Sequence, residues 1–123
     1  MTMLTEFPHT GSFVLSMDDD GNLSVDNVVI ASSAAVLQPG TVLGKVTASG
    51  KLLPLAFAAA DGTQTFAGIL FGLADPTLAD APAVAVTRHA EVYASRLIWP
   101  VGATGIQIAA ALAQAAAALI VAR

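Results

Sequence analysis

A proline–glycine pair at Pro39-Gly40, followed by an apolar run and a further glycine at Gly44, most constrains the fold of this chain. Proline presets φ at the first central position of a turn, and glycine accepts the positive φ that a type II turn requires at the second. The run Thr41-Val42-Leu43 favours a strand. A glycine within a strand indicates a bulge or a close approach of another backbone segment. The stretch therefore predicts a turn-and-strand unit in a small β domain.

Short apolar runs separated by turn residues extend this pattern along the chain. Near Arg88 and His89 the apolar phase shifts, which indicates either two strands or one bent strand. Pro54 has no N–H to donate, so its strand lies at a sheet edge or ends there. The strands that we expect span residues 23–30, 41–46, 51–55, 64–73 and 83–95.

The one clear helical pattern begins after Thr104, which is a good N-cap, and it precedes a possible short final strand at residues 120–123. This helix is apolar on two flanks, which predicts cover on two sides. One cover would be the chain's own sheet and the other a neighbouring subunit. One flank holds Ile106, Ala109, Ala113, Ala116 and Ile120, and the other holds Ile108, Leu112, Ala115 and Leu119. The expected fold class is mainly β with one C-terminal helix (α+β), in a single domain over residues 17–123.

Charge is scarce in this sequence. Charged residues make up 11% of the 123 residues, whereas about a quarter is usual in soluble domains. A small domain with so few charges must share apolar surface, so we expect an oligomer. The net charge is −4 and the five basic residues are scattered, which argues against nucleic-acid binding. The longest apolar run, residues 108–122, is too short for a membrane span, so we expect no membrane role.

Residues 1–16 show no helical or strand period, yet they are more apolar than an ordinary linker. They are either a frayed terminus or a flexible arm that orders on a partner. In the second case an extended segment would add to a sheet edge of that partner. The candidate contact residues of this arm are Phe7, Phe13, Val14 and Leu15.

Candidate catalytic and metal-binding residues are few. The acidic stretch Asp18-Asp19-Asp20 lacks the ligand spacing of an EF-hand, so a solvated loop is favoured. His89 and Glu91 would share a strand face, and the simpler interpretation is a polar surface pair. Trp99, before Pro100, marks either a binding pocket or an interface or core anchor. With no cysteine and no phosphate-binding loop, we expect no enzyme, no metal and no cofactor.

Read together, several blocks resemble the head decoration protein family of tailed phages, which contains the lambda-type capsid-stabilising protein. The resemblance covers about residues 25–123, and it depends on the order and spacing of the blocks. These are residues 35–45 (AVLQPGTVLGK), 59–64 (AADGTQ), 67–70 (AGIL), 88–95 (RHAEVYAS), 98–104 (IWPVGAT), 110–114 (AALAQ) and 120–123 (IVAR).

The resemblance implies a small β-clip-like domain that forms a homotrimer and has a flexible N-terminal arm. Such trimers are made in the host cytoplasm and sit on the outer surface of the expanded head, where they clamp major capsid subunits against the pressure of packaged DNA. In the family the arm orders on the shell and pairs with capsid-protein strands. The residues we expect as trimer or core anchors are Pro39, Trp99, Pro100, Ile106 and Leu112.

An alternative function is a trimeric β-clip domain that binds a small molecule or hydrolyses a nucleotide. It would need a polar pocket, at a subunit interface near His89, Glu91 and Arg96. A generic trimeric adaptor or receptor-binding module of the virion is a third option.

Overall fold

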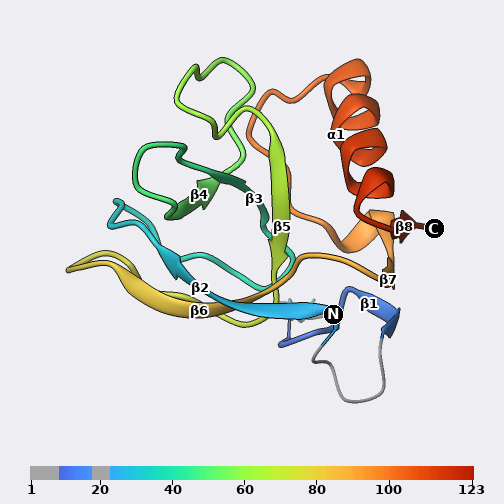
Figure 1. Cartoon of the computed structure of the whole chain (residues 1–123), viewed down its shortest axis with the longest axis horizontal. Coiled ribbons are helices and arrows are strands. Elements are labelled where there is room, and N and C mark those ends of the chain that lie inside the picture. The colour runs from blue at the N-terminus through green and yellow to red at the C-terminus, as the bar shows by residue number, and fades with distance from the viewer. Residues whose placement is uncertain (1–8, 18–22) are drawn as a thin grey trace, which may run out of the picture.

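The structure is a computed structural model that describes residues 9–17 and 23–123 (Figure 1). Within these ranges the chain is mostly β, with a single C-terminal helix, which confirms the expected class. The strands are β1 (Val14–Met17), β2 (Val25–Ile30), β3 (Val42–Lys45), β4 (Leu52–Pro54), β5 (Phe66–Leu70), β6 (Ala81–Val86), β7 (Ala90–Val92) and β8 (Ile120–Ala122). The helices are the 3₁₀ turn η1 (Ala94–Arg96) and α1 (Gly105–Ala117).

Five strands close into a barrel in the order β2-β4-β3-β5-β6, with β6 returning to pair with β2. Successive residues of a strand point to opposite faces. One face of every barrel strand supplies one apolar cluster, which fills the interior of the barrel. Its members include Ile30, Leu43, Leu52, Leu70 and Ala85.

The opposite face of the barrel strands supports a second sheet and the helix. Val42, Ile69 and Val86, each beside an interior residue, belong to a separate cluster with Val92 of β7 and Ile120 of β8. The second sheet has the order β1-β7-β8, with β1 antiparallel and β8 parallel to β7. Segments from both ends of the chain therefore flank the central strand β7, at the right of Figure 1.

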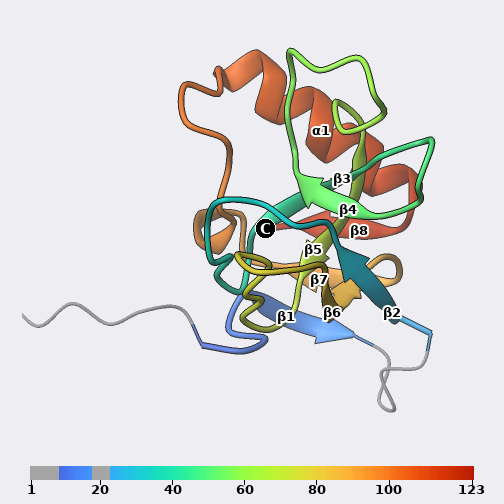
Figure 2. The same cartoon turned by 90° about the vertical axis from the view of Figure 1, so that its left-hand side faces the viewer.

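The expected N-cap of the helix is confirmed. The Thr104 hydroxyl accepts from the Gln107 N–H, and the Gln107 side chain accepts from the Thr104 N–H, which together make a capping box. The helix lies against β5 and β8, above the barrel in Figure 2, and the Phe66 N–H donates to Gln114 Oε1 at 2.8 Å. Ala111 and Ala115 are buried in this contact.

The second apolar flank of the helix lies open in the single chain. Its members Ile106, Ala109, Ala113 and Ala116 are exposed, with Ile106 retaining 85% of its accessible surface, whereas its last member, Ile120, is buried on β8. On the other flank Ala115 is buried and Ile108 and Leu112 are half-buried, but Leu119 is 56% exposed, so the chain's own strands cover that flank only in part. Cover of the open flank by a second subunit stays a prediction.

The opening turn and its strand also match their prediction. Gly40 has a φ of +96°. The register between β3 and β5 shifts at Leu43 and Gly44, and a Cβ on Gly44 would lie 2.3 Å from the Thr63 carbonyl oxygen. Gly44 therefore combines a bulge with a close backbone approach. Pro54 is the last residue of β4, where its missing N–H does least harm.

Two strand boundaries differ from the expectation. The strand predicted over residues 64–73 is shorter, because β5 covers only Phe66–Leu70. Strand β6 begins at Ala81, two residues before the start of the strand expected over residues 83–95. Pro82 is tolerated because it lies near the start of its strand and is exposed. The phase shift after Arg88 separates two strands, β6 and β7, at His89, which has a φ of +53°.

The larger correction concerns the N-terminal segment. The sequence predicts that residues 1–16 form an arm outside the domain. Phe13 is fully buried in the core, and its ring meets Phe71 edge-on with 6.5 Å between centroids. β1 pairs with β7, so residues 11–17 belong to the folded body. Burial of Phe13 acts together with the pairing of β1 and β7 and the hydrogen bond from the Gly11 N–H to the Phe71 carbonyl oxygen, and their sum offsets the backbone entropy lost on ordering the segment. Phe7 and the acidic stretch at Asp18-Asp19-Asp20 lie outside the described residues.

Candidate functional site

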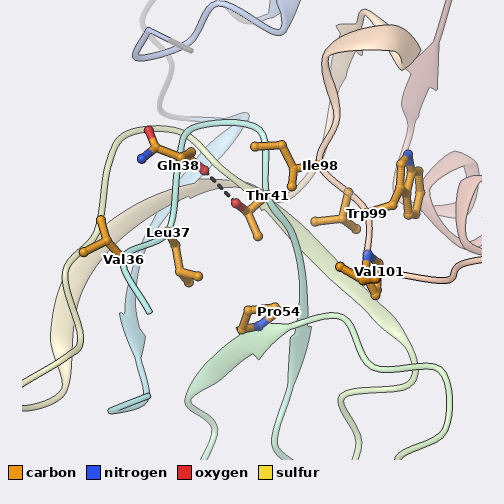
Figure 3. A pocket seen from close by; sticks show the side chains of 10 residues that line it. Val36, Leu37, Gln38, Thr41, Pro54, Ile98, Trp99 and Val101 are labelled. Atoms are coloured by element: carbon orange, nitrogen blue, oxygen red, sulfur yellow. Dashed lines mark hydrogen bonds between the residues drawn. The ribbon is translucent and has the colours of Figure 1, made fainter. Parts of the chain in front are cut away.

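An apolar hollow of about 250 Å³ opens beside the Pro39-Gly40 turn. Val36 and Leu37 form one wall, Ile98 and Trp99 the other, and Pro54 lies between them (Figure 3). The Thr41 hydroxyl donates to the Gln38 carbonyl oxygen at 2.7 Å, which satisfies the hydroxyl within the wall.

A second hollow of about 270 Å³ adjoins the first, and Phe57 and Ala103 are among its lining residues. Pro100 and Val101 line both hollows, so they form the ridge between them, and the Val101 side chain is fully exposed on it. Among residues 9–17 and 23–123, no charged residue lines either hollow. We call the surface formed by the two hollows and the Pro100-Val101 ridge the apolar band.

The expected trimer or core anchors lie in different places. Pro39 is buried in the body. Trp99 and Leu112 are half-buried and pack against the core below the helix. Pro100 lies on the ridge of the apolar band, and Ile106 projects from the open flank of the helix. Pro100 and Ile106 are therefore available to a partner. Trp99 connects the band to the core.

The candidate arm residues that the structure describes lie at the start of the body. Phe13 is a core residue and Val14 is half-buried against the same cluster. Leu15 is 41% exposed on β1, which is an outer strand of its sheet. An outer strand presents unpaired backbone groups that another chain can bind. Of these three residues, Leu15 is the one that is open to a partner.

Glu91 and Arg96, two of the residues that an enzymatic pocket would need, have separate partners. Glu91 Oε2 lies 3.5 Å from Arg123 Nε. Arg96 Nη1 donates to the Ser12 carbonyl oxygen at 2.7 Å. The third residue, His89, occupies the turn before β7, where its carbonyl oxygen accepts from the buried Ser24 hydroxyl. His89 and Glu91 line one open hollow of about 300 Å³, and Arg96 is not among the residues that line it.

The perturbed carboxylates are framework groups. The Thr87 hydroxyl, together with the Arg88 guanidinium, holds the pKa of Asp26 below its ordinary value. Hydrogen bonds from Lys51 and from the Ser32 N–H lower the pKa of Asp80. Within residues 9–17 and 23–123, no group of three histidine, aspartate or glutamate side chains is placed to hold a metal ion. No helix in that part of the chain is long and apolar enough to cross a membrane.

Sequence reasoning missed most of the apolar band. Val36, Phe57 and Val101 come from three separate connections, and no periodicity joins them. The available signal was local: Val101 stands between Pro100 and Gly102, a turn context in which a β-branched apolar residue is unusual.

Comparison with known proteins assigns the chain to a family. A comparison with curated proteins gave no match. The family model of the bacteriophage lambda head decoration protein D matches residues 3–120, nearly the whole chain. The chain therefore belongs to this family of phage head decoration proteins, structural proteins of the capsid surface.

Proposed function

We propose that this protein cements the phage head: it binds the outer surface of the expanded shell as a homotrimer and holds major capsid subunits together against the pressure of packaged DNA. The observation that carries the proposal is an uncharged apolar band on a member of the head decoration family. A surface of this kind is suited to permanent contact with another protein.

The apolar band is the proposed contact between subunits. Val101 projects as a ridge, and the hollow on either side has room for an apolar side chain. When a ridge and a hollow occur on one surface, a second copy can insert its ridge into the hollow of the first. Such a head-to-tail contact closes into a ring if the rotation between copies fits. Pro100 and Trp99 are part of this contact, and Ile106 is a further exposed apolar residue, on the open flank of the helix.

The shell-binding part is proposed to be the N-terminal arm, now limited to the residues before the body, together with the outer strand β1. Phe7 in the arm and Leu15 on β1 are its apolar contacts. A strand of the major capsid protein can pair with the outer side of β1, because among the described residues β1 pairs with β7 alone. Three arms on one trimer multiply a weak single contact into tight attachment.

Oligomeric state tests the subunit contact. Val101→Asp places a charge on the ridge, and we expect it to convert a trimer to a monomer with little change in fold, as measured by analytical ultracentrifugation and circular dichroism. Leu78→Asp is the matched control, because Leu78 is 98% exposed in the loop before β6. A wild-type protein that is monomeric both free and on the shell would contradict the trimer. A trimeric Val101→Asp protein would contradict this interface.

Shell stability tests the cementing function. Expanded shells that lack a decoration protein are heated with and without the full chain, and disassembly is followed by light scattering. We expect the added protein to raise the disassembly temperature until its sites are saturated. Binding without any gain in stability would leave a decorating role and reject cementing.

A further inference from the structure

The point at which the N-terminal segment joins the body is fastened by a group of contacts around Gly11 and Phe13. The Gly11 N–H donates to the Phe71 carbonyl oxygen at 2.8 Å, and the Val14 N–H donates back to the Gly11 carbonyl oxygen at 3.0 Å. Gly11 has a φ of +68°, and a Cβ there would lie 2.9 Å from the Phe71 ring. Phe13 fills the core two residues later.

Arg96 adds two side-chain contacts to this group. Its Nη1 donates to the Ser12 carbonyl oxygen at 2.7 Å, and its guanidinium lies 4.7 Å from the centre of the Tyr93 ring. The Tyr93 N–H donates to the Phe13 carbonyl oxygen at 2.8 Å. A planar guanidinium that both stacks and donates loses little freedom for each contact that it makes.

The segment that carries Arg96 is itself held firmly by the turn at Gly40. The Ile98 N–H donates to the Gly40 carbonyl oxygen at 2.8 Å, and the Gly40 N–H donates to the Leu70 carbonyl oxygen at 2.8 Å. A Cβ on Gly40 would lie 2.7 Å from the Arg96 carbonyl oxygen, so the two backbones touch. Arg96 thus connects the N-terminal segment to a fixed part of the barrel.

We propose that Arg96 is a positioning residue for shell binding, which, with Tyr93, latches the Ser12-Phe13 backbone and so fixes where the arm leaves the body. The proposal rests on the proposed function of the arm. A fixed exit point confines the arm to a smaller volume, which raises its effective concentration at the shell site. It also reduces the entropy that binding must overcome. If the exit point were loose, the effective concentration of the arm at the shell site would fall and the entropy cost of binding would rise, even though Arg96 itself makes no contact with the shell.

The test compares Arg96→Gln with Lys51→Gln in the full chain. Both remove one exposed cation, and Lys51 pairs with Asp80 instead of with the N-terminal segment. We expect Arg96→Gln to speed hydrogen exchange at the Gly11 amide and to weaken binding to expanded shells about tenfold, since a small loss in each of three arms multiplies. Its melting temperature should stay within a few degrees of wild type. Lys51→Gln should change neither the exchange nor the affinity.

Two further variants keep the outcomes distinct. Arg96→Lys retains a donor for Ser12 and loses the stacked plane, so it should recover part of the Gly11 protection and part of the affinity. Deletion of residues 1–8 should abolish tight binding. If the deletion binds as well as wild type, both the arm's role and the latch are overturned. If the deletion abolishes binding, two results for Arg96→Gln would overturn only the latch. One is wild-type affinity for the shell, and the other is wild-type protection of the Gly11 amide from exchange.

Discussion

The closed barrel and the three-stranded sheet differ in how they treat their edges. The barrel is formed by β2 to β6, and its closure leaves every strand with two neighbours. The second sheet has two outer strands, β1 and β8, and exposed apolar side chains on both, at Leu15 and Val121. Barrel closure removes the edges that promote association, whereas an open sheet retains them.

This difference assigns separate roles to the two regions. The barrel strands come from one continuous stretch, residues 25–86, while β1 and β8 come from opposite ends of the chain and meet at β7. The barrel can therefore act as a stable base. The sheet, with the helix beside it, carries the outer strands β1 and β8 and the open flank of the helix.

The largest expected effect is a loss of stability on truncation, which distinguishes the residues that belong to the sheet from the arm that precedes them. Deletion of residues 1–16 removes Phe13 and most of β1, so we expect the free energy of unfolding to fall by about 5 kcal/mol. Deletion of residues 1–8 should leave it unchanged within about 0.5 kcal/mol. Urea denaturation of the two truncated proteins measures both values. Equal stability of the two would place the whole segment outside the fold and remove β1 from the comparison.

The barrel was easier to predict from sequence than the sheet, for a physical reason. Turn chemistry at Pro39-Gly40 and the bulge at Gly44 are local, so the residues themselves carry the signal. β1 exists only because β7 is there to pair with it, and Phe13 is buried by groups far away in the chain. The apolar band has the same character, since Trp99 and Pro100 were singled out from the sequence but the residues that surround them from other loops were not.

The next effect tests how tightly the barrel is closed. Gly44→Ala drives a methyl group into the backbone of the buried Thr63, whose carbonyl oxygen also accepts from the Ala56 N–H at 2.9 Å. We expect a loss of about 3 kcal/mol in the free energy of unfolding. Gly105→Ala is the control, because a Cβ there meets nothing within 4 Å and alanine favours the helix. Should Gly44→Ala match this control in thermal denaturation, the barrel would be more compliant than its geometry indicates.

A smaller effect concerns the helix that covers the sheet side. Thr104→Ala removes the side-chain half of the capping box, and we expect a loss of about 1 kcal/mol. Thr65→Ala, at an exposed threonine outside the helix, serves as the control. Chemical denaturation resolves a difference of this size. If the helix contributes to stability only through Ala111 and Ala115, the two variants will behave alike.

The smallest expected effect is the pH dependence of stability that comes from surface ion pairs, one on the barrel and one on the open sheet. Asp26 on β2 accepts from Thr87 and Arg88 just beyond β6, and these contacts, the Thr87 hydroxyl first, hold its pKa below its ordinary value. A carboxyl whose pKa is lower in the folded state stabilises the fold above about pH 4, and this contribution disappears as the pH falls through the folded pKa. Asp26 and Arg88 are both more than a third exposed, so after allowance for solvent screening the contribution is about a few tenths of a kcal/mol.

Asp26→Asn should thus be slightly less stable than wild type at pH 7, and the difference should vanish in acid. Thr87→Val should raise the pKa of Asp26, measured by NMR titration, more than Arg88→Gln does. Glu91→Gln on β7 is the control, because its pair with Arg123 is longer, at 3.5 Å, and includes an arginine side chain that is 61% exposed. A larger loss from Glu91→Gln than from Asp26→Asn would mean that the open sheet, and not the barrel, depends more on its surface charges.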